Sequence, residues 1–319
     1  MEPLFLQPAL KDFIWGGHRL PQEYGYAADG LDKVAEAWVL SCHPQGSAVV
    51  KDGTWAGHKL PCVLKEWGAA ALGARGAAFP EFPLLIKLID AHDRLSVQVH
   101  PDDEYARRVE GEQGKTEMWY ILDCEPGARL LYGVSRELTR EEFRRRIEGN
   151  TLDEAVRYVP VKKGDVFFIP SGTLHAIGAG ILLAEVQQNS ATTYRVSDYG
   201  RLGADGKPRA LHIDKALDVT HLTPTPLSTA GLWQREEPAG GRTVRLAECR
   251  YFTAESWQIC GSRAAGQPDS FQSLLCLEGT GELRWDGGSH PITKGDSVFV
   301  PAGQPVTLHG TLSMLASWV

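Results

Sequence analysis

Hydrophobic residues along this chain fall mostly into short runs that are separated by turns rich in Gly, Pro and Asp. Residues 84–89 (LLIKLI), 118–122 (MWYIL) and 166–169 (VFFI) form three such runs. Short apolar runs between turn residues are typical of strands in a β-sandwich or a β-barrel. The pattern therefore predicts a mainly β protein.

One segment departs from this pattern because its apolar residues recur at helical spacing. Phe143 and Ile147 lie one helical turn apart, and Thr139 with Glu142 has the spacing of a capping box. We predict a small helical insertion within residues 139–158.

The chain also contains an internal repeat. Residues 162–172 (KKGDVFFIPSG) return as residues 293–303 (TKGDSVFVPAG), so both copies contain a Lys-Gly-Asp turn, an apolar strand and a Pro-x-Gly turn. Upstream, residues 117–122 have a counterpart in residues 272–277. A repeat of this kind indicates two copies of one antiparallel β unit.

The boundary between the two copies is expected in the Pro- and Thr-rich stretch 222–227. This places a first domain at residues 1–225, which includes the helical insertion, and a second domain at residues 226–319. The second domain is predicted to be a degenerate copy of the first, without metal ligands.

The two copies differ at two informative positions. The position of His175 in the first copy is held by Val306 in the second, and Glu117 corresponds to Gln272. The second copy therefore keeps the turns and lacks these two side chains. We interpret the shared residues as holding the fold and the unshared ones as holding a metal in the first copy.

Strand alternation brings further donors to the same place. Gln98 and His100 are two residues apart, as are Lys115 and Glu117, so each pair shares one face of a strand. In a small barrel that face is the interior, where His175 arrives from a turn stiffened by proline. The other histidines lie outside this pattern and are interpreted as surface or hydrogen-bonded core residues.

Gln98, His100, Glu117 and His175 together offer two imidazoles, a carboxylate and an amide oxygen. This donor set suits zinc and tolerates manganese, iron or cobalt. We predict one divalent metal per chain, with Zn²⁺ as the best match.

Composition limits the partners of the chain. With 43% hydrophobic and 23% charged residues it is ordinary for a globular protein, and a net charge of -7 with a pI near 5.8 argues against nucleic acid. No apolar run reaches the roughly 20 residues that span a bilayer, and no signal peptide is evident. The six scattered cysteines favour reduced thiols. We expect a cytoplasmic protein without a membrane partner, as a monomer or a small homo-oligomer.

The Gly-Asp-x(4)-Pro-x-Gly-x-x-His pattern of residues 164–175 resembles the second motif of the cupin jelly-roll barrels. A larger ordered set of segments resembles the short bacterial form of the type I mannose-6-phosphate isomerases. These segments are 14–17, 36–38, 83–91, 95–102, 114–120, 170–176 and 194–201. The resemblance implies two cupin-type jelly-roll barrels, the first of them catalytic.

The resemblance also implies an activity, the interconversion of mannose 6-phosphate and fructose 6-phosphate through an enediol, with zinc at the four ligand positions. It places Arg195 in the active site, where a guanidinium binds oxyanions. Lys115 is then either a general acid–base or a contact to phosphate or hydroxyl. Ser96, on the face of Gln98, is a candidate donor to the substrate phosphate.

One position departs from the family pattern. Many members carry an Asp four residues before the active-site Arg, whereas this chain has Ala191. Any role of that Asp cannot be carried over, and Asp198 is the remaining candidate to orient Arg195. Glu185 and Gln187 are candidates to support the ligands.

Other functions stay open at this point. A non-catalytic or regulatory sugar-binding cupin would keep the metal without turnover, and an isomerase of a related sugar phosphate would keep the whole site. A metal-dependent oxygenase needs only two histidines and a carboxylate. The presence of Lys115 and Arg195 beside the ligands favours the isomerase.

Overall fold

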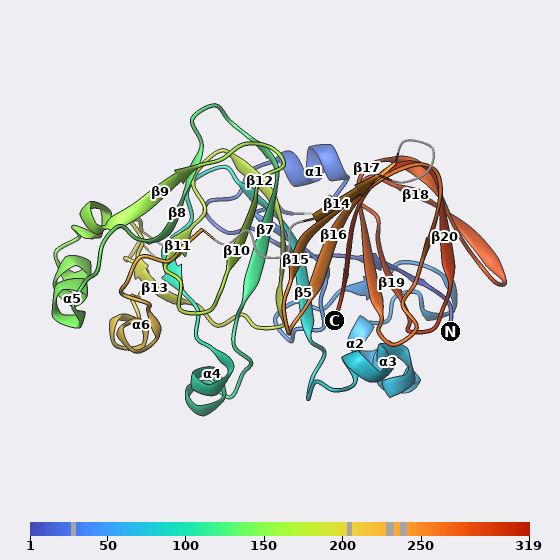
Figure 1. Cartoon of the computed structure of the whole chain (residues 1–319), viewed down its shortest axis with the longest axis horizontal. Coiled ribbons are helices and arrows are strands. Elements are labelled where there is room, and N and C mark those ends of the chain that lie inside the picture. The colour runs from blue at the N-terminus through green and yellow to red at the C-terminus, as the bar shows by residue number, and fades with distance from the viewer. Residues whose placement is uncertain (27–29, 203–205, 228–232, 237–240) are drawn as a thin grey trace.

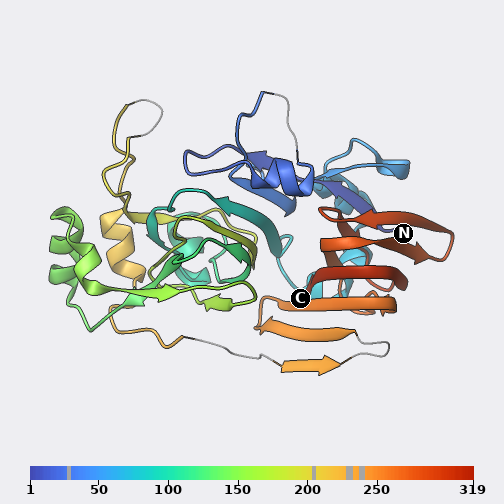
Figure 2. The same cartoon turned by 90° about the horizontal axis from the view of Figure 1, so that it is seen from above.

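The computed structural model describes residues 1–26, 30–202, 206–227, 233–236 and 241–319. Its strands form three antiparallel sheets, which make two β-barrels side by side (Figure 1). Figure 2 shows both chain termini at the second barrel. The mainly β prediction with two cupin-type barrels is confirmed.

The first barrel consists of two facing sheets. The six-stranded sheet has the order β10-β7-β12-β5-β3-β2. Its strands are β2 (Ala9–Lys11), β3 (Glu36–Leu40), β5 (Leu84–Ala91), β7 (Glu117–Cys124), β10 (Val166–Ile169) and β12 (Ile181–Gln188). The five-stranded sheet has the order β13-β6-β11-β8-β9. Its strands are β6 (Val97–Val99), β8 (Arg129–Val134), β9 (Val156–Pro160), β11 (His175–Ala176) and β13 (Tyr194–Ser197).

Apolar side chains from the inner faces of both sheets fill part of this barrel. Ile89, Trp119 and Leu130 belong to this one buried cluster. The other part of the interior holds polar residues, including Lys87 and Glu185, which are also buried. The barrel therefore has an apolar half and a polar half.

The second barrel is a curled nine-stranded sheet with the order β14-β15-β16-β20-β17-β19-β1-β4, in which β18 pairs with β17. Its strands are β1 (Leu4–Gln7), β4 (Val49–Val50), β14 (Trp233–Glu236), β15 (Arg242–Glu248), β16 (Thr253–Ala265), β17 (Gln272–Trp285), β18 (Gly288–Thr293), β19 (Ser297–Val300) and β20 (Val306–Trp318). The N-terminal strands β1 and β4 thus join the sheet of the C-terminal half. The domain boundary between residues 225 and 226 stays a prediction.

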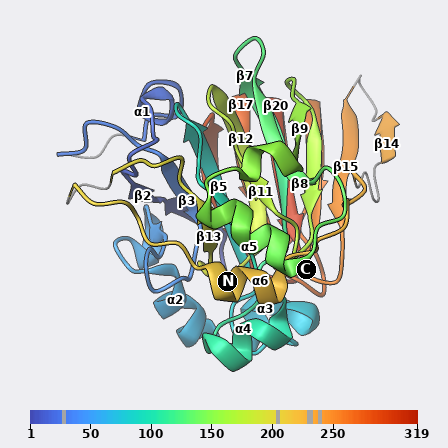
Figure 3. The ribbon, with the colours of Figure 1, turned by 90° about the vertical axis from the view of Figure 1, so that its left-hand side faces the viewer.

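Helices cover the edges and outer faces of the sheets. They are α1 (Arg19–Tyr24), α2 (Leu60–Trp67), α3 (Ala69–Gly76), α4 (Asp103–Val109), α5 (Arg140–Glu148) and α6 (Ile213–Val219), with short 3₁₀ turns η1 (Gly53–Trp55) and η2 (Leu152–Ala155). Helices α5 and α6 lie over the outer face of the five-stranded sheet (Figure 3), where Phe143 and Leu217 join the core that includes Val97. No helix within the described ranges combines the length and apolarity that crossing a bilayer requires.

The predicted helical insertion is confirmed in part. The hydroxyl of Thr139 accepts a hydrogen bond from the backbone N–H of Glu142 at 3.1 Å, as an N-cap should. The helix ends at Glu148, however, and residues 156–158 already belong to β9. Among the described residues five further short helices form, which the sequence pattern did not indicate.

Strand register confirms the alignment of the two repeats. In the first barrel Ile169 pairs with Glu117, and in the second Val300 pairs with Gln272. Both pairs therefore join the last residue of the repeated strand to the first residue of its partner. Gln272 accordingly takes the structural place of Glu117.

Candidate metal centre and active site

Three neighbouring strands present three of the predicted site residues on one face. In the five-stranded sheet Gln98 pairs with His175 on one side and with Arg195 on the other. Directly opposed residues of neighbouring strands point to the same face. Gln98 therefore lies between His175 and Arg195, facing the polar half of the barrel.

The other two predicted ligands approach from strand ends. His100 follows β6, and its carbonyl oxygen accepts a hydrogen bond from the N–H of Gly172 at 2.8 Å. This bond ties the Pro-x-Gly turn before His175 to the loop that carries His100. Glu117 begins β7 in the facing sheet. The two sheets thus close around one point.

At that point three buried donors converge. Nε2 of His100 lies 3.6 Å from Oε2 of Glu117, and Nε2 of His175 lies 3.4 Å from Oε1 of the same carboxylate. The two Nε2 atoms are 3.1 Å apart. These donor atoms all lie within 4.8 Å of one another, so the group is able to hold one metal ion.

Backbone carbonyls select the metal-binding form of both histidines. Nδ1 of His100 lies 2.9 Å from the carbonyl oxygen of Thr192, and Nδ1 of His175 lies 2.8 Å from that of Thr173. Because a carbonyl only accepts, each Nδ1 carries the proton and each Nε2 presents a lone pair. Burial, followed by the charge of Lys115, lowers the pKa of both rings, to about 4 for His175. Both are therefore neutral, as metal ligands must be.

The facing lone pairs make the centre electron-rich. Two imidazole nitrogens at 3.1 Å, beside a fully buried carboxylate, repel one another unless positive charge lies among them. A divalent cation with N and O ligands satisfies this requirement. The donor set consequently fits the predicted metal.

Lys115 extends into the same centre. Its ammonium lies 2.6 Å from Oε2 of Glu117 and 2.9 Å from Nε2 of His100. Burial and the neighbouring Glu185 raise the pKa of Glu117 to about 7, although Lys115 acts in the opposite direction. The buried carboxylate and imidazole lone pairs thus attract a cation, and the ammonium of Lys115 is one cation that contacts them.

The remaining predicted residues line one cavity beside the donors. Its volume is about 220 Å³, and its walls include Ser96, Gln98, Lys115 and Arg195. The structure therefore brings the substrate-contact candidates to the same cavity as a predicted ligand. Ala191, at the position where the family carries Asp, also lines it.

Arg195 is held by the backbone. Its Nη1 donates to the carbonyl oxygen of Ala210 at 3.1 Å, while its buried Nε has no hydrogen-bond partner among the described residues. Burial, and then the charge of Arg209, lower the pKa of Arg195. An incompletely satisfied guanidinium at a cavity wall is suited to an anionic or hydroxyl-rich ligand.

The expectation that Asp198 orients Arg195 was wrong. The carboxylate of Asp198 accepts from Arg201 at 2.7 Å and from Nε of Arg209 at 2.7 Å. Arg209 itself lines the cavity. Asp198 therefore positions Arg209, which adds a second guanidinium near Arg195.

Sequence reasoning missed a buried ion pair in the cavity wall. Nζ of Lys87 lies 2.8 Å from Oε1 of Glu185 and 3.6 Å from Oε2 of Glu36. Burial alone would raise the pKa of Glu185, but Lys87 and Lys115 hold it at about 2. Each carboxylate also accepts from an indole N–H: Glu185 from Trp119 at 3.0 Å and Glu36 from Trp38 at 2.6 Å.

A signal for this pair was present in the sequence. Lys87 is the one charged residue in the apolar run 84–89, and charged residues are rarely buried without a partner. Its partner is set by register, since Glu185 stands directly opposite Lys87 on β12. The expectation that Glu185 supports the site agrees with its place in the cavity wall. Gln187 instead donates to the backbone carbonyls of Gln188 and Ser190.

Comparison with known proteins gives consistent results. Residues 4–124 match the sequence model of the phosphomannose isomerase type I catalytic domain, and residues 242–319 match that of the mannose-6-phosphate isomerase cupin domain. The mannose-6-phosphate isomerase of Streptococcus mutans is 40% identical over 306 residues, covering 94% of this chain and 92% of the relative. The mannose-6-phosphate isomerase ManA of Bacillus subtilis is 41% identical over 303 residues, covering 95% and 94%.

Solved structures agree with these matches. The crystal structure of the mannose 6-phosphate isomerase from Bacillus subtilis has a TM-score of 0.91 and 36% sequence identity, with 100% of both chains covered. A putative mannosephosphate isomerase from Archaeoglobus fulgidus has a TM-score of 0.77 at 22% identity, with 99% of this chain and 98% of that chain covered, and shares the fold.

Proposed function

The chain belongs to the type I mannose-6-phosphate isomerases, and we propose that it interconverts mannose 6-phosphate and fructose 6-phosphate at the centre formed by His100, Glu117 and His175. The observation that carries this proposal is the convergence of three buried donors beside a cavity that contains Lys115 and Arg195. The enzyme is an aldose–ketose isomerase, so it moves a proton between C1 and C2 of the sugar through an enediol.

Gln98 is proposed as the fourth ligand, and Zn²⁺ as the metal. The amide oxygen of Gln98 would complete a set of two imidazoles and two oxygens, which suits zinc better than a hard cation such as calcium. When bound, the ion supplies Lewis-acid stabilisation of negative charge on the sugar oxygens O1 and O2. The carbonyl oxygens of Thr192 and Thr173 keep both imidazoles oriented for this role.

Lys115 is proposed to act on the substrate. Its ammonium reaches the donors from the cavity wall, so it is within reach of a sugar that occupies the cavity. In this position it either carries the proton between C1 and C2 or donates hydrogen bonds to sugar oxygens. The ion pair of Lys87 with Glu185 holds a fixed carboxylate nearby and so keeps the environment of Lys115 constant.

Arg195 and Ser96 are proposed as substrate contacts. Arg195 lines the cavity, and Arg209 lies in the same cavity with Asp198 holding it. Two guanidiniums match the charge of a phosphate ester, and a serine hydroxyl adds a neutral donor. The cytoplasmic location and the small oligomeric state stay predictions from the sequence.

A coupled assay tests the function. Purified protein supplied with Zn²⁺ is expected to convert each sugar phosphate into the other, to lose activity on chelation, and to regain it when Zn²⁺ is returned. A panel of related hexose phosphates measured in parallel identifies the preferred substrate.

The main alternative, a sugar-binding cupin, predicts a different result. Such a protein would bind mannose 6-phosphate in calorimetry, in a metal-dependent manner, without forming fructose 6-phosphate. Binding without turnover by metal-loaded protein contradicts the proposed activity.

A further inference from the structure

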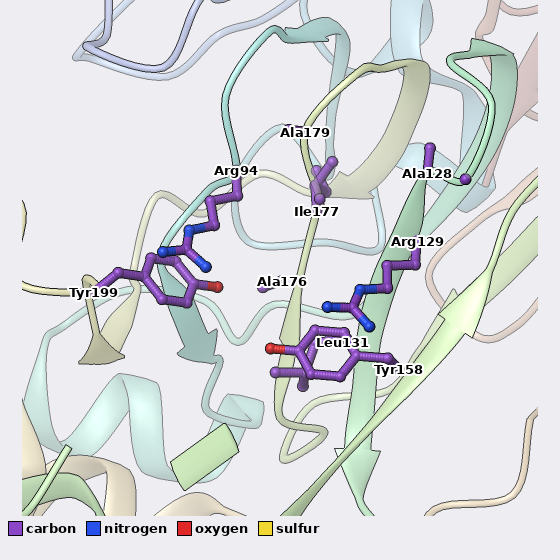
Figure 4. Close-up of a pocket in the computed structure, with 11 residues that line it drawn as sticks. Arg94, Ala128, Arg129, Leu131, Tyr158, Ala176, Ile177, Ala179 and Tyr199 are labelled. Carbon is purple, nitrogen blue, oxygen red and sulfur yellow. The ribbon is translucent and has the colours of Figure 1, made fainter. Parts of the chain in front are cut away.

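A second cavity lies on the outer face of the five-stranded sheet. Its volume is about 240 Å³. Its walls come from the ends of β8 and β9, from the loop that follows β11, and from residues near Arg94 and Tyr199 (Figure 4). None of the proposed metal ligands or substrate contacts lines it.

Two arginines dominate the walls of this cavity. The guanidinium of Arg94 stacks on the ring of Tyr199 at 3.6 Å, and that of Arg129 stacks on the ring of Tyr158 at 4.3 Å. Figure 4 shows both guanidiniums extending toward the space between the two tyrosine rings, and both hydroxyl groups pointing inward. Stacking on an aromatic face leaves the N–H donors in the plane of each guanidinium free to bind a ligand.

The cavity has an excess of positive charge. Neither guanidinium has a carboxylate partner within the described part of the chain, and none of the residues lining the cavity is acidic. Asp153 lies outside this set of lining residues and accepts a hydrogen bond from the hydroxyl of Tyr158 at 2.8 Å. By contrast, the cavity at the metal centre includes the carboxylates of Glu36 and Glu185.

The backbone that positions these groups is constrained. Tyr199 has a φ of 57°, in the left-handed region that a bulky residue rarely adopts. Arg201 holds the same wall, because it donates to the carbonyl oxygen of Arg94 at 2.6 Å and pairs with Asp198 at 2.7 Å. Across the cavity, Gly178 approaches Arg129 so closely that a Cβ atom would lie 1.9 Å from the arginine's carbonyl oxygen.

We propose that this cavity is a binding site for a phosphate group, either inorganic phosphate or the phosphate of a small metabolite, separate from the catalytic site. Arg94 and Arg129 supply charge-assisted hydrogen bonds from opposite walls, and the hydroxyl of Tyr199 supplies a neutral donor. The volume leaves space beside the phosphate for a small organic group.

The site is connected to the metal centre through one short strand. Successive residues of a strand point to opposite faces, so His175 faces the metal centre while Ala176 lines the phosphate cavity. Ile177, the next residue, lines both cavities. A phosphate bound in the outer cavity therefore lies against β11, the strand that carries the proposed metal ligand His175.

Arginine modification with phenylglyoxal, mapped by mass spectrometry of peptides, tests the site residue by residue. With a dissociation constant on the order of 1 mM, 10 mM inorganic phosphate is expected to slow the modification of Arg94 and Arg129 about tenfold relative to potassium chloride of equal ionic strength. The exposed Arg284, on the hairpin of β17 and β18, is the matched control and should show no protection.

A variant distinguishes one shared site from two unrelated residues. Arg129→Gln should remove most of the protection of Arg94 and leave the isomerase kcat/KM within about twofold. Equal rates in phosphate and chloride overturn the proposal, as does equal protection of Arg284. Full protection of Arg94 in the Arg129→Gln variant also overturns it, since the two arginines would then not share a ligand.

Discussion

The two barrels share a repeated turn–strand–turn unit, but the side chains in their interiors differ in polarity. In both copies an aspartate closes the Lys-Gly-Asp turn: Asp165 accepts from the N–H of Lys162 at 2.9 Å, and Asp296 from that of Thr293 at 2.8 Å. Above these equivalent turns, the first barrel contains a half-polar interior. The second contains an apolar core.

Strand register extends the comparison to every proposed ligand. His175 pairs with Gln98 and Tyr132, as Val306 pairs with Ala265 and Trp285. The N–H of the turn glycine bonds to the carbonyl of His100 in one barrel and to that of Gln267 in the other. In the second barrel the four ligand positions are therefore held by Ala265, Gln267, Gln272 and Val306.

This difference separates the requirements of the fold from those of the site. Gln272 keeps a polar side chain at the place of Glu117, but its Oε1 accepts from the N–H of Gly266 at 2.8 Å and so supports the backbone. A barrel of this type evidently forms without a metal centre. Charged groups in a protein interior do not in general add stability, so the fold alone does not account for the buried charges of the first barrel.

The largest expected effect comes from removing a proposed ligand of the first barrel, with the matching substitution in the second barrel as its control. His175→Ala should lower kcat/KM by about 10³-fold or more, equivalent to about 4 kcal/mol, because the centre loses a donor that holds the metal. Val306→Ala should change kcat/KM by less than about threefold. Similar losses from both substitutions would show that the second barrel also takes part in catalysis.

A second contrast concerns stability. Lys87→Met leaves Glu185 as an uncompensated buried charge and should lower the free energy of unfolding by about 3 kcal/mol in urea denaturation. The double variant Lys87→Met with Glu185→Leu should recover part of this loss, because the closer pair is then removed as a whole and only Glu36 still lacks its contact with Lys87. A double variant as unstable as the single one would mean that the pair, and not the isolated charge, determines the effect.

The smallest expected effect is the pH dependence of metal affinity. Glu117 has its pKa raised to about 7, so below pH 7 the metal must displace a proton and its affinity should fall about tenfold per pH unit. His175, with its pKa lowered to about 4, adds nothing until the pH is far lower. Competition titrations with a chelator between pH 5.5 and about 8.5 measure the slope. An affinity that is constant over this range contradicts the assignment of Glu117 as a ligand.

Much of the site could be predicted from the sequence because it depends on local spacing. Alternation along a strand placed Gln98 with His100 and Lys115 with Glu117, and the repeat singled out His175 by its absence from the second copy. These inferences need only the period of a strand and the stiffness of a turn. The N-cap of α5 could be predicted for the same reason, because Thr139 and Glu142 are only three residues apart.

Features that depend on long-range pairing were missed. The partner of Lys87 is determined by the register of β5 against β12. The contact of Asp198 with Arg209 depends on how the chain between them folds back, which the sequence does not show. The short helices α2 and α3 lack side-chain N-caps, so packing against the sheets supports them. The pairing of β1 with β19 in the second barrel likewise joins segments that are far apart in the sequence.

The central claim, that the metal belongs to the first barrel alone, is tested most directly by metal content. Protein purified with Zn²⁺ and desalted is measured by elemental mass spectrometry for three forms: the natural chain, the double variant Glu117→Ala with His175→Ala, and the double variant Gln272→Ala with Val306→Ala. We predict about one metal per chain, almost none, and about one, respectively. Retention of metal by the first double variant, or its loss from the second, would contradict the account.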